Sequence, residues 1–111
     1  RPLVMYENAQ DEQSWLPTNL EDARRIHRRV LGTLSDYDAQ QGGQLQHTLL
    51  VFLQQNRSWQ KAADRLNVHK QTLVYRIRRV EEISGRSIDS SEDVVVLWIA
   101  MRAGQIAGIM E

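Results

Sequence analysis

The stretch that most constrains the fold runs from residue 67 to residue 84. Its apolar side chains Leu73, Ile77 and Val80 recur at the i, i+4, i+7 spacing of one helical face. Polar and basic side chains occupy the positions between them and project from the opposite face. This pattern predicts a helix over residues 69–84, ended by the glycine at 85, that packs on a small core and exposes amide, phenol and guanidinium groups.

A shorter helix is predicted immediately before it, over residues 58–66. Ser58 can cap its N-terminus by accepting a backbone N–H bond. Asn67 follows its end, and asparagine is among the few non-glycine residues that adopt the left-handed conformation of a tight turn. A helix, a short turn and a helix with an exposed polar face form a helix-turn-helix, here predicted at about residues 58–84.

The flanking segments supply further helices, because such a motif cannot bury enough surface alone. Asn19 can cap a helix from residue 20 to about residue 34, which a polar connection over 35–43 joins to another helix over 44–56. Ser90 can cap a last helix that is apolar on every side over 94–100. We therefore expect an all-α fold, a small bundle of about five helices spanning residues 20–111. Residues 1–19 are predicted to be a linker or the remnant of an upstream domain, with Leu3–Tyr6 as its last strand.

The charge distribution favours a nucleic-acid partner. The chain of 111 residues has a net charge of zero, but residues 57–80 carry seven basic side chains against one acidic. Such a local field steers a protein towards phosphate. Four arginines on the first helix, at 24, 25, 28 and 29, are more typical of a solvated face, although contact with DNA backbone is the alternative.

Other classes of protein fit less well. The chain has no cysteine and no apolar span of about 20 residues, so we expect a cytoplasmic protein without a membrane segment. His27 has no second ligand at metal-binding spacing, and no paired histidine and carboxylate or glycine-rich phosphate loop is present. We expect neither a metal, nor a cofactor, nor an enzymatic activity. The first residue is Arg1 and not methionine, so we also expect a longer parent polypeptide.

The central run resembles the C-terminal helix-turn-helix of PucR/CdaR-type transcriptional regulators, over about residues 45–103. The residues that carry the resemblance are Asn56-Arg57-Ser58-Trp59, Ala62-Ala63, Leu66, Val68-His69, Thr72-Leu73 and Tyr75 to Glu81. The chain departs from that pattern at Lys70, Gln71 and Val74, where arginine, asparagine and arginine are expected. These positions face outwards, so they bear on the preferred DNA sequence and not on the fold. The resemblance implies a DNA-binding output domain, with a sensor region upstream.

The predicted interface with double-stranded DNA has two parts. Glutamine can pair with adenine, arginine with guanine, and valine can touch a thymine methyl group. The side chains expected near base edges are Gln71, Val74, Tyr75 and Arg78. The side chains expected at the DNA backbone are Ser58, Lys61, His69, Lys70, Thr72, Arg76 and Arg79. His69 could instead cap the recognition helix, and Trp59 is expected in the core beneath the motif.

The apolar last helix leaves a second hypothesis open, a helical protein–protein interaction or dimerisation module. Under the DNA-binding hypothesis a homodimer is expected, because one recognition helix reads only a few base pairs. The residues expected to form its interface are Val94, Val95, Leu97, Trp98 and Met101. DNA binding requires Tyr75 and Arg78 to be exposed, whereas a protein-binding module would keep its affinity after both become alanine.

Overall fold

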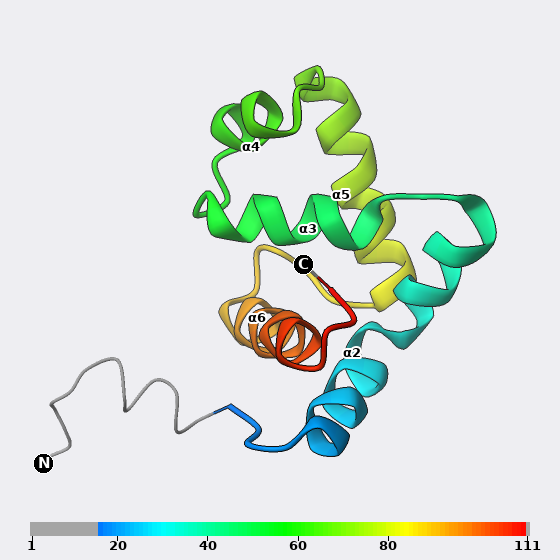
Figure 1. Cartoon of the computed structure of the whole chain (residues 1–111). Coiled ribbons are helices and arrows are strands. Elements are labelled where there is room, and N and C mark those ends of the chain that lie inside the picture. Colours follow the sequence, from blue (N-terminus) through cyan, green and yellow to red (C-terminus); the bar gives the residue numbers. More distant parts are fainter. Residues whose placement is uncertain (1–15, 111) are drawn as a thin grey trace, which may run out of the picture.

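The computed structural model describes residues 16–110 and folds them into five α-helices with no strand among them (Figure 1). The helices are α2 (Leu20–Gln41), α3 (Leu45–Gln54), α4 (Trp59–Leu66), α5 (Lys70–Ser84) and α6 (Ser91–Ile106). The long α2 packs along α6, while α3 packs against both α4 and α5. The predicted all-α bundle with a helix-turn-helix is confirmed.

Helix α4 adds the fully buried Ala62 to the core, and the other four helices supply its larger fully buried apolar side chains. These are Leu31 and Leu34 of α2, Leu49 and Phe52 of α3, Leu73, Ile77 and Val80 of α5, and Leu97 and Met101 of α6. Each burial removes apolar surface from water, the main favourable term in folding. The helix-turn-helix therefore rests on a platform made by the other helices.

The predicted N-caps act as expected. The side chain of Asn19 accepts a hydrogen bond from the backbone N–H of Asp22 at 2.8 Å, and that of Ser90 accepts one from Asp93 at 3.2 Å. The carboxylate of Asp93 in turn accepts the Ser87 N–H at 2.9 Å and pairs with Arg86 at 3.0 Å. The Ser87 N–H, with help from the Arg86 guanidinium, holds the pKa of Asp93 below its usual value. This carboxylate fixes the loop that enters α6.

The predicted end of the first helix at about residue 34 is wrong, because α2 continues to Gln41. Tyr37 packs against the core one turn beyond Leu34, so the buried face extends through a segment whose polar composition suggested a connection. The helix ends at Gly42, which takes the left-handed conformation at φ 62°. The Asp38 carboxylate then accepts the N–H groups of Leu45 and Gln46, both at 2.9 Å, and so caps α3.

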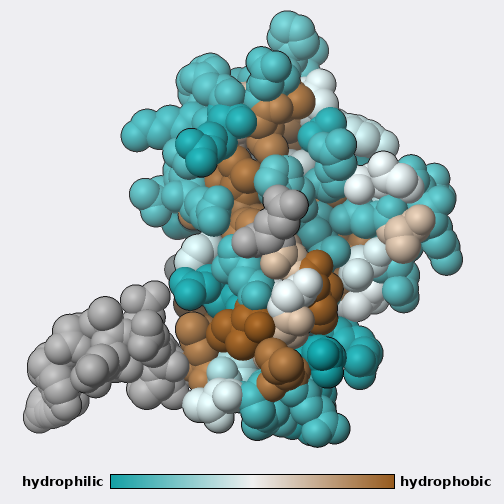
Figure 2. Space-filling model, in the orientation of Figure 1, coloured by the Kyte–Doolittle hydropathy of each residue, from teal (hydrophilic) through white to brown (hydrophobic). Residues whose placement is uncertain are grey.

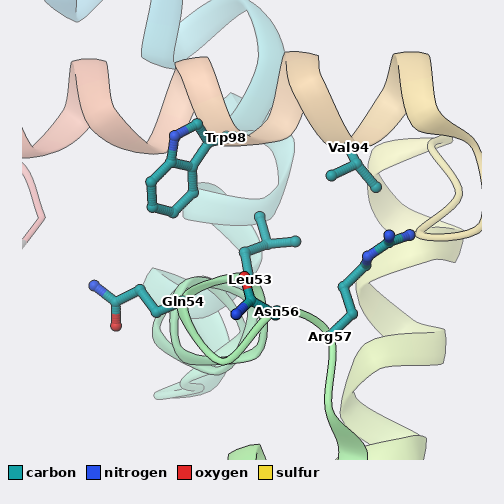
Figure 3. A pocket seen from close by; sticks show the side chains of 6 residues that line it. All are labelled: Leu53, Gln54, Asn56, Arg57, Val94 and Trp98. Carbon is teal, nitrogen blue, oxygen red and sulfur yellow. The ribbon is translucent and has the colours of Figure 1, made fainter. Parts of the chain in front are cut away.

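The predicted dimerisation face on α6 needs a correction. Leu97 and Met101 have no exposed surface, because they pack inside the domain, so they cannot contact a second copy. Val94 and Trp98 are half-buried and line a hollow between α6 and the end of α3 (Figure 3). Of the five residues only Val95, at 54% exposure, lies open on the surface.

The remaining surface divides by polarity. Figure 2 shows hydrophilic side chains along the outer edge of α4 and α5, whereas apolar side chains gather over α6. Within residues 16–110 no helix combines the length and the hydropathy needed to cross a bilayer. The expected linker and the strand at Leu3–Tyr6 fall outside the described residues, except for the last positions of the linker, 16–19.

Candidate nucleic-acid interface

The turn between α4 and α5 has the local structure that the sequence predicts. The Ser58 hydroxyl accepts the Lys61 N–H at 3.1 Å and caps α4. Asn67 adopts the left-handed conformation at φ 58°, and the following Val68 N–H returns to the Ala63 carbonyl at 3.0 Å. Ala62 and Ala63 are buried, and their small side chains let α5 approach closely. The two helices form a helix-turn-helix.

The two faces of α5 differ sharply in exposure. Leu73, Ile77 and Val80 are fully buried. On the other side Gln71, Tyr75 and Arg78 are exposed, with Tyr75 at 64%, and Val74 between them is half-buried. The spacing of these four outward residues places them on one helical face. The structure therefore brings together the four side chains expected to read bases.

The side chains expected at the DNA backbone surround this face less uniformly. Lys61, His69 and Lys70 are exposed, while Ser58 and Thr72 are half-buried. His69 occupies the N-cap position of α5 in an extended conformation, but its side chain makes no capping hydrogen bond. The imidazole of His69 therefore does not cap α5 in this structure, and its contact with DNA phosphate stays a prediction.

Arg76 points towards the domain rather than away from it. Its Nη1 donates to the Thr48 hydroxyl of α3 at 3.3 Å, and Thr48 is fully buried. The Arg76 side chain is itself half-buried. This guanidinium helps to hold α5 against α3. Its contact with DNA phosphate stays a prediction, and such a contact would be made by the N–H groups that do not bond Thr48.

Arg78 and Arg79 are each held by an acid and an aromatic ring. Arg78 pairs with Glu81 at 2.8 Å and lies over the Trp59 ring, 5.8 Å from its centroid. Hydrogen bonding to the Glu81 carboxylate raises the pKa of Arg78. Arg79 pairs with Glu82 at 2.7 Å and lies 5.1 Å from the centroid of the Tyr37 ring. The bond to Glu82, with a further contribution from Tyr37, raises the pKa of Arg79. Both guanidinium groups are therefore charged, and each has an acid and an aromatic ring beside it.

The match to known proteins agrees with this geometry. Residues 45–103, more than half of the chain, match the model of the PucR C-terminal helix-turn-helix domain. The chain belongs to this family. The matched region runs from the start of α3 into the last turns of α6 and contains the whole motif.

Two relatives are named as regulators. The chain is 40% identical over 90 residues to "Transcriptional activator PmfR" of Paenarthrobacter nicotinovorans, covering 81% of the chain and 19% of that protein. It is 32% identical over 83 residues to "Purine catabolism regulatory protein" of Bacillus subtilis (strain 168), covering 75% of the chain and 15% of that protein. The chain spans less than a fifth of either relative. No solved structure gives a significant match. The chain thus contains a PucR-type helix-turn-helix domain.

Two residues that support the exposed face of α5 were not foreseen from the sequence. Glu81, already paired with Arg78, uses its other oxygen to accept the N–H of Ile88 at 3.0 Å. Arg57, with a left-handed φ of 62°, donates to the carbonyl of the same residue at 3.0 Å. The spacing of Arg78 and Glu81 is a visible signal for a helical ion pair. The bond from Arg57 joins residues far apart in the sequence, and the bond from Glu81 depends on the loop between α5 and α6, so helical spacing could indicate neither of them.

Trp59 lies where it was expected, against the core beneath the motif. Its ring centroid is 4.7 Å from that of Phe52, and the Arg78 guanidinium lies over the Trp59 ring at 5.8 Å from its centroid. It is half-buried. Within residues 16–110 helix α2 contacts α5 but not α4. Its arginines lie beside the C-terminal part of the domain, where Arg25 and Arg29 line a hollow with Val96 and Ile99, and Arg24 and Arg28 line one with Ile109. His27 of α2 is buried and hydrogen-bonds Gln46 at 2.7 Å.

Proposed function

We propose that this domain is the output module of a bacterial transcriptional regulator and binds double-stranded DNA by placing α5 in the major groove. The observation that carries the proposal is the exposed face of α5. Gln71, Tyr75 and Arg78 project from it together, directly opposite a fully buried face. Amide and guanidinium groups in this arrangement match the donor and acceptor patterns of base edges. Bacterial chromosomal DNA lies in the cytoplasm, which is where such a module would act.

Phosphate contacts would fix the orientation of α5. Lys61, His69 and Lys70 are exposed around the beginning of the helix, and Arg76 and Arg79 flank its outward face. The amide end of α5 near Thr72 adds the positive end of a helix dipole. These groups carry no sequence information, but they supply most of the salt-dependent affinity. Ser58 holds the start of α4 beside them.

Specific recognition would require two copies. One recognition helix reads a few base pairs, and two half-sites about one helical turn apart supply the rest. Of the five α6 residues expected at the dimer interface, Leu97 and Met101 are buried, so a second copy would meet Val95 and the edges of Val94 and Trp98. A sensor region elsewhere in the parent polypeptide would control this assembly.

The test is fluorescence anisotropy of a labelled random duplex across a salt series. We expect binding that weakens steeply with salt, and an Arg78→Ala, Arg79→Ala variant that binds less tightly with a slope shallower by about one to two. The matched control is Arg24→Ala, Arg28→Ala, which removes the same charge from an exposed part of α2. We expect the control to bind like the wild type.

Two results would contradict the proposal. Equal losses in the two double variants would mean that overall charge, and not α5, attracts DNA. Absence of binding in a chain that carries two linked copies would favour a protein-binding role for the motif.

A further inference from the structure

We propose that Glu81 is a positioning residue that holds Arg78 for reading a base and prevents it from gripping phosphate. This inference rests on the proposed DNA-binding function and extends it to a residue that would not itself contact DNA. It follows from a chain of contacts that begins on the exposed face of α5 and ends in the loop between α5 and α6.

The first contacts hold the Arg78 guanidinium. Its Nη1 donates to Glu81 Oε1 at 2.8 Å, and its central carbon lies 5.8 Å from the centroid of the Trp59 ring. A guanidinium carries five N–H donors, and the bond to Glu81 uses one of them. The others suffice for a bidentate contact with the O6 and N7 atoms of guanine. The pair therefore restrains Arg78 without exhausting its donors.

The next contact anchors Glu81 itself. Its second oxygen accepts the N–H of Ile88 at 3.0 Å, and the Ile88 carbonyl accepts a bond from Arg57 at 3.0 Å. Figure 3 shows the Arg57 side chain extending towards the loop between α5 and α6. The Ile88 side chain is buried, at 4% exposure. The Glu81 carboxylate is thus bonded on both oxygens, and one of its partners is backbone fixed in the core.

The neighbouring pair lacks this anchor. Glu82 meets Arg79 at the same i, i+3 spacing and at 2.7 Å, but its side chain is 64% exposed whereas that of Glu81 is 18% exposed. A largely exposed carboxylate contributes little to the position of its partner, because it moves in water, and Arg79 is instead covered by the Tyr37 ring. The chain therefore contains a matched control for Glu81, with the same charge, the same spacing and a different environment.

The expected consequence concerns discrimination between DNA sequences. Without the carboxylate, Arg78 would be free to reach the nearest phosphates, which are abundant and independent of sequence. Glu81→Gln should then bind random DNA more tightly, and its preference for a selected site over random DNA should fall about fivefold or more, the lower end of what one bidentate contact supplies. Glu82→Gln also removes one negative charge, so it should tighten random binding similarly but leave the preference within about twofold of the wild type.

The experiment starts from a duplex selected out of a random pool with the wild-type chain, and measures Kd for that duplex and for random DNA. The variants are Glu81→Gln, Glu82→Gln, Arg78→Lys and the double variant Arg78→Lys, Glu81→Gln. Lysine keeps the charge but lacks the planar fork. We therefore expect Arg78→Lys to lose the same preference as Glu81→Gln, and the double variant to lose no more than either.

Non-additivity distinguishes positioning from a purely structural role. Equal preferences in Glu81→Gln and Glu82→Gln would overturn the assignment. A further loss of preference on adding Glu81→Gln to Arg78→Lys would overturn it as well, because Glu81 would then act other than through Arg78. Glu81→Gln retains an oxygen that can accept the Ile88 N–H. If this variant nevertheless weakens the fold, Arg78→Lys supplies the test, because it leaves Glu81 and its loop contact intact. An unchanged preference for the selected duplex in Arg78→Lys would then overturn the proposal. A wild-type chain that binds neither duplex, even as two linked copies, would remove the proposed function and this assignment together.

Discussion

Ile77→Ala is expected to destabilise the domain by about 2–5 kcal/mol, because it empties a fully buried site in the middle of α5. Helix α5 packs on α2, α3 and α4, so the cavity weakens the contact between the motif and the rest of the core. A domain of this size has about 5–15 kcal/mol of stability in total. We expect the thermal midpoint to fall by about 10 °C or more, as measured by circular dichroism at 222 nm.

The control for this prediction is Tyr75→Ala, two positions away on the same helix. Tyr75 is 64% exposed, so its removal should change stability by no more than about 0.5 kcal/mol. DNA affinity should nevertheless fall, because the phenol lies on the proposed reading face. A Tyr75→Ala variant as unstable as Ile77→Ala would mean that this face is packed and not free to enter a groove.

Linking two copies of the chain should raise the affinity for a two-half-site duplex by about 10²–10⁴, the range that avidity supplies without a new contact. Half-sites placed one turn of DNA apart in this duplex would be separated by about 34 Å. A Gly/Ser linker of about 36 residues has a root-mean-square span of about 30–36 Å and so matches this distance. Comparing Kd for the linked and the single chain on the same selected duplex measures the gain.

The matched control keeps the linker and replaces Arg78 and Arg79 by alanine in one of the two copies. This chain has one intact recognition helix, so its affinity should return most of the way to that of the single chain. A linked chain that binds no more tightly than the single chain would contradict recognition by two copies. Equal gains from both linked chains would mean that the second helix does not reach DNA.

Much of this structure could be predicted because its signals are local. The spacing of Leu73, Ile77 and Val80 is enough to orient α5, and Ser58 and Asn67 mark the start and the end of α4. The outward face of α5 follows from the same periodicity. Capping and helical spacing act over one or two turns, which is the range that sequence patterns cover.

The misjudged features depend on tertiary packing and on loop conformation, which helical spacing does not indicate. The polar composition of residues 35–41 hides the packing of Tyr37 and the cap that Asp38 provides to α3. The all-round apolar pattern of α6 could not reveal that Leu97 and Met101 face inwards while Val95 faces solvent. Likewise, the bond between Glu81 and Ile88 exists only once the loop after α5 has folded back.

The central claim is that the exposed face of α5 is the surface that meets DNA, and nuclear magnetic resonance tests it most directly. A ¹⁵N-labelled chain is titrated with a selected duplex while the backbone amide shifts are followed. We expect the largest changes at Lys61 and over residues 69–78, with residues 20–33 of α2 almost unchanged. The largest changes in α2 or α6, with α5 unaffected, would contradict the claim.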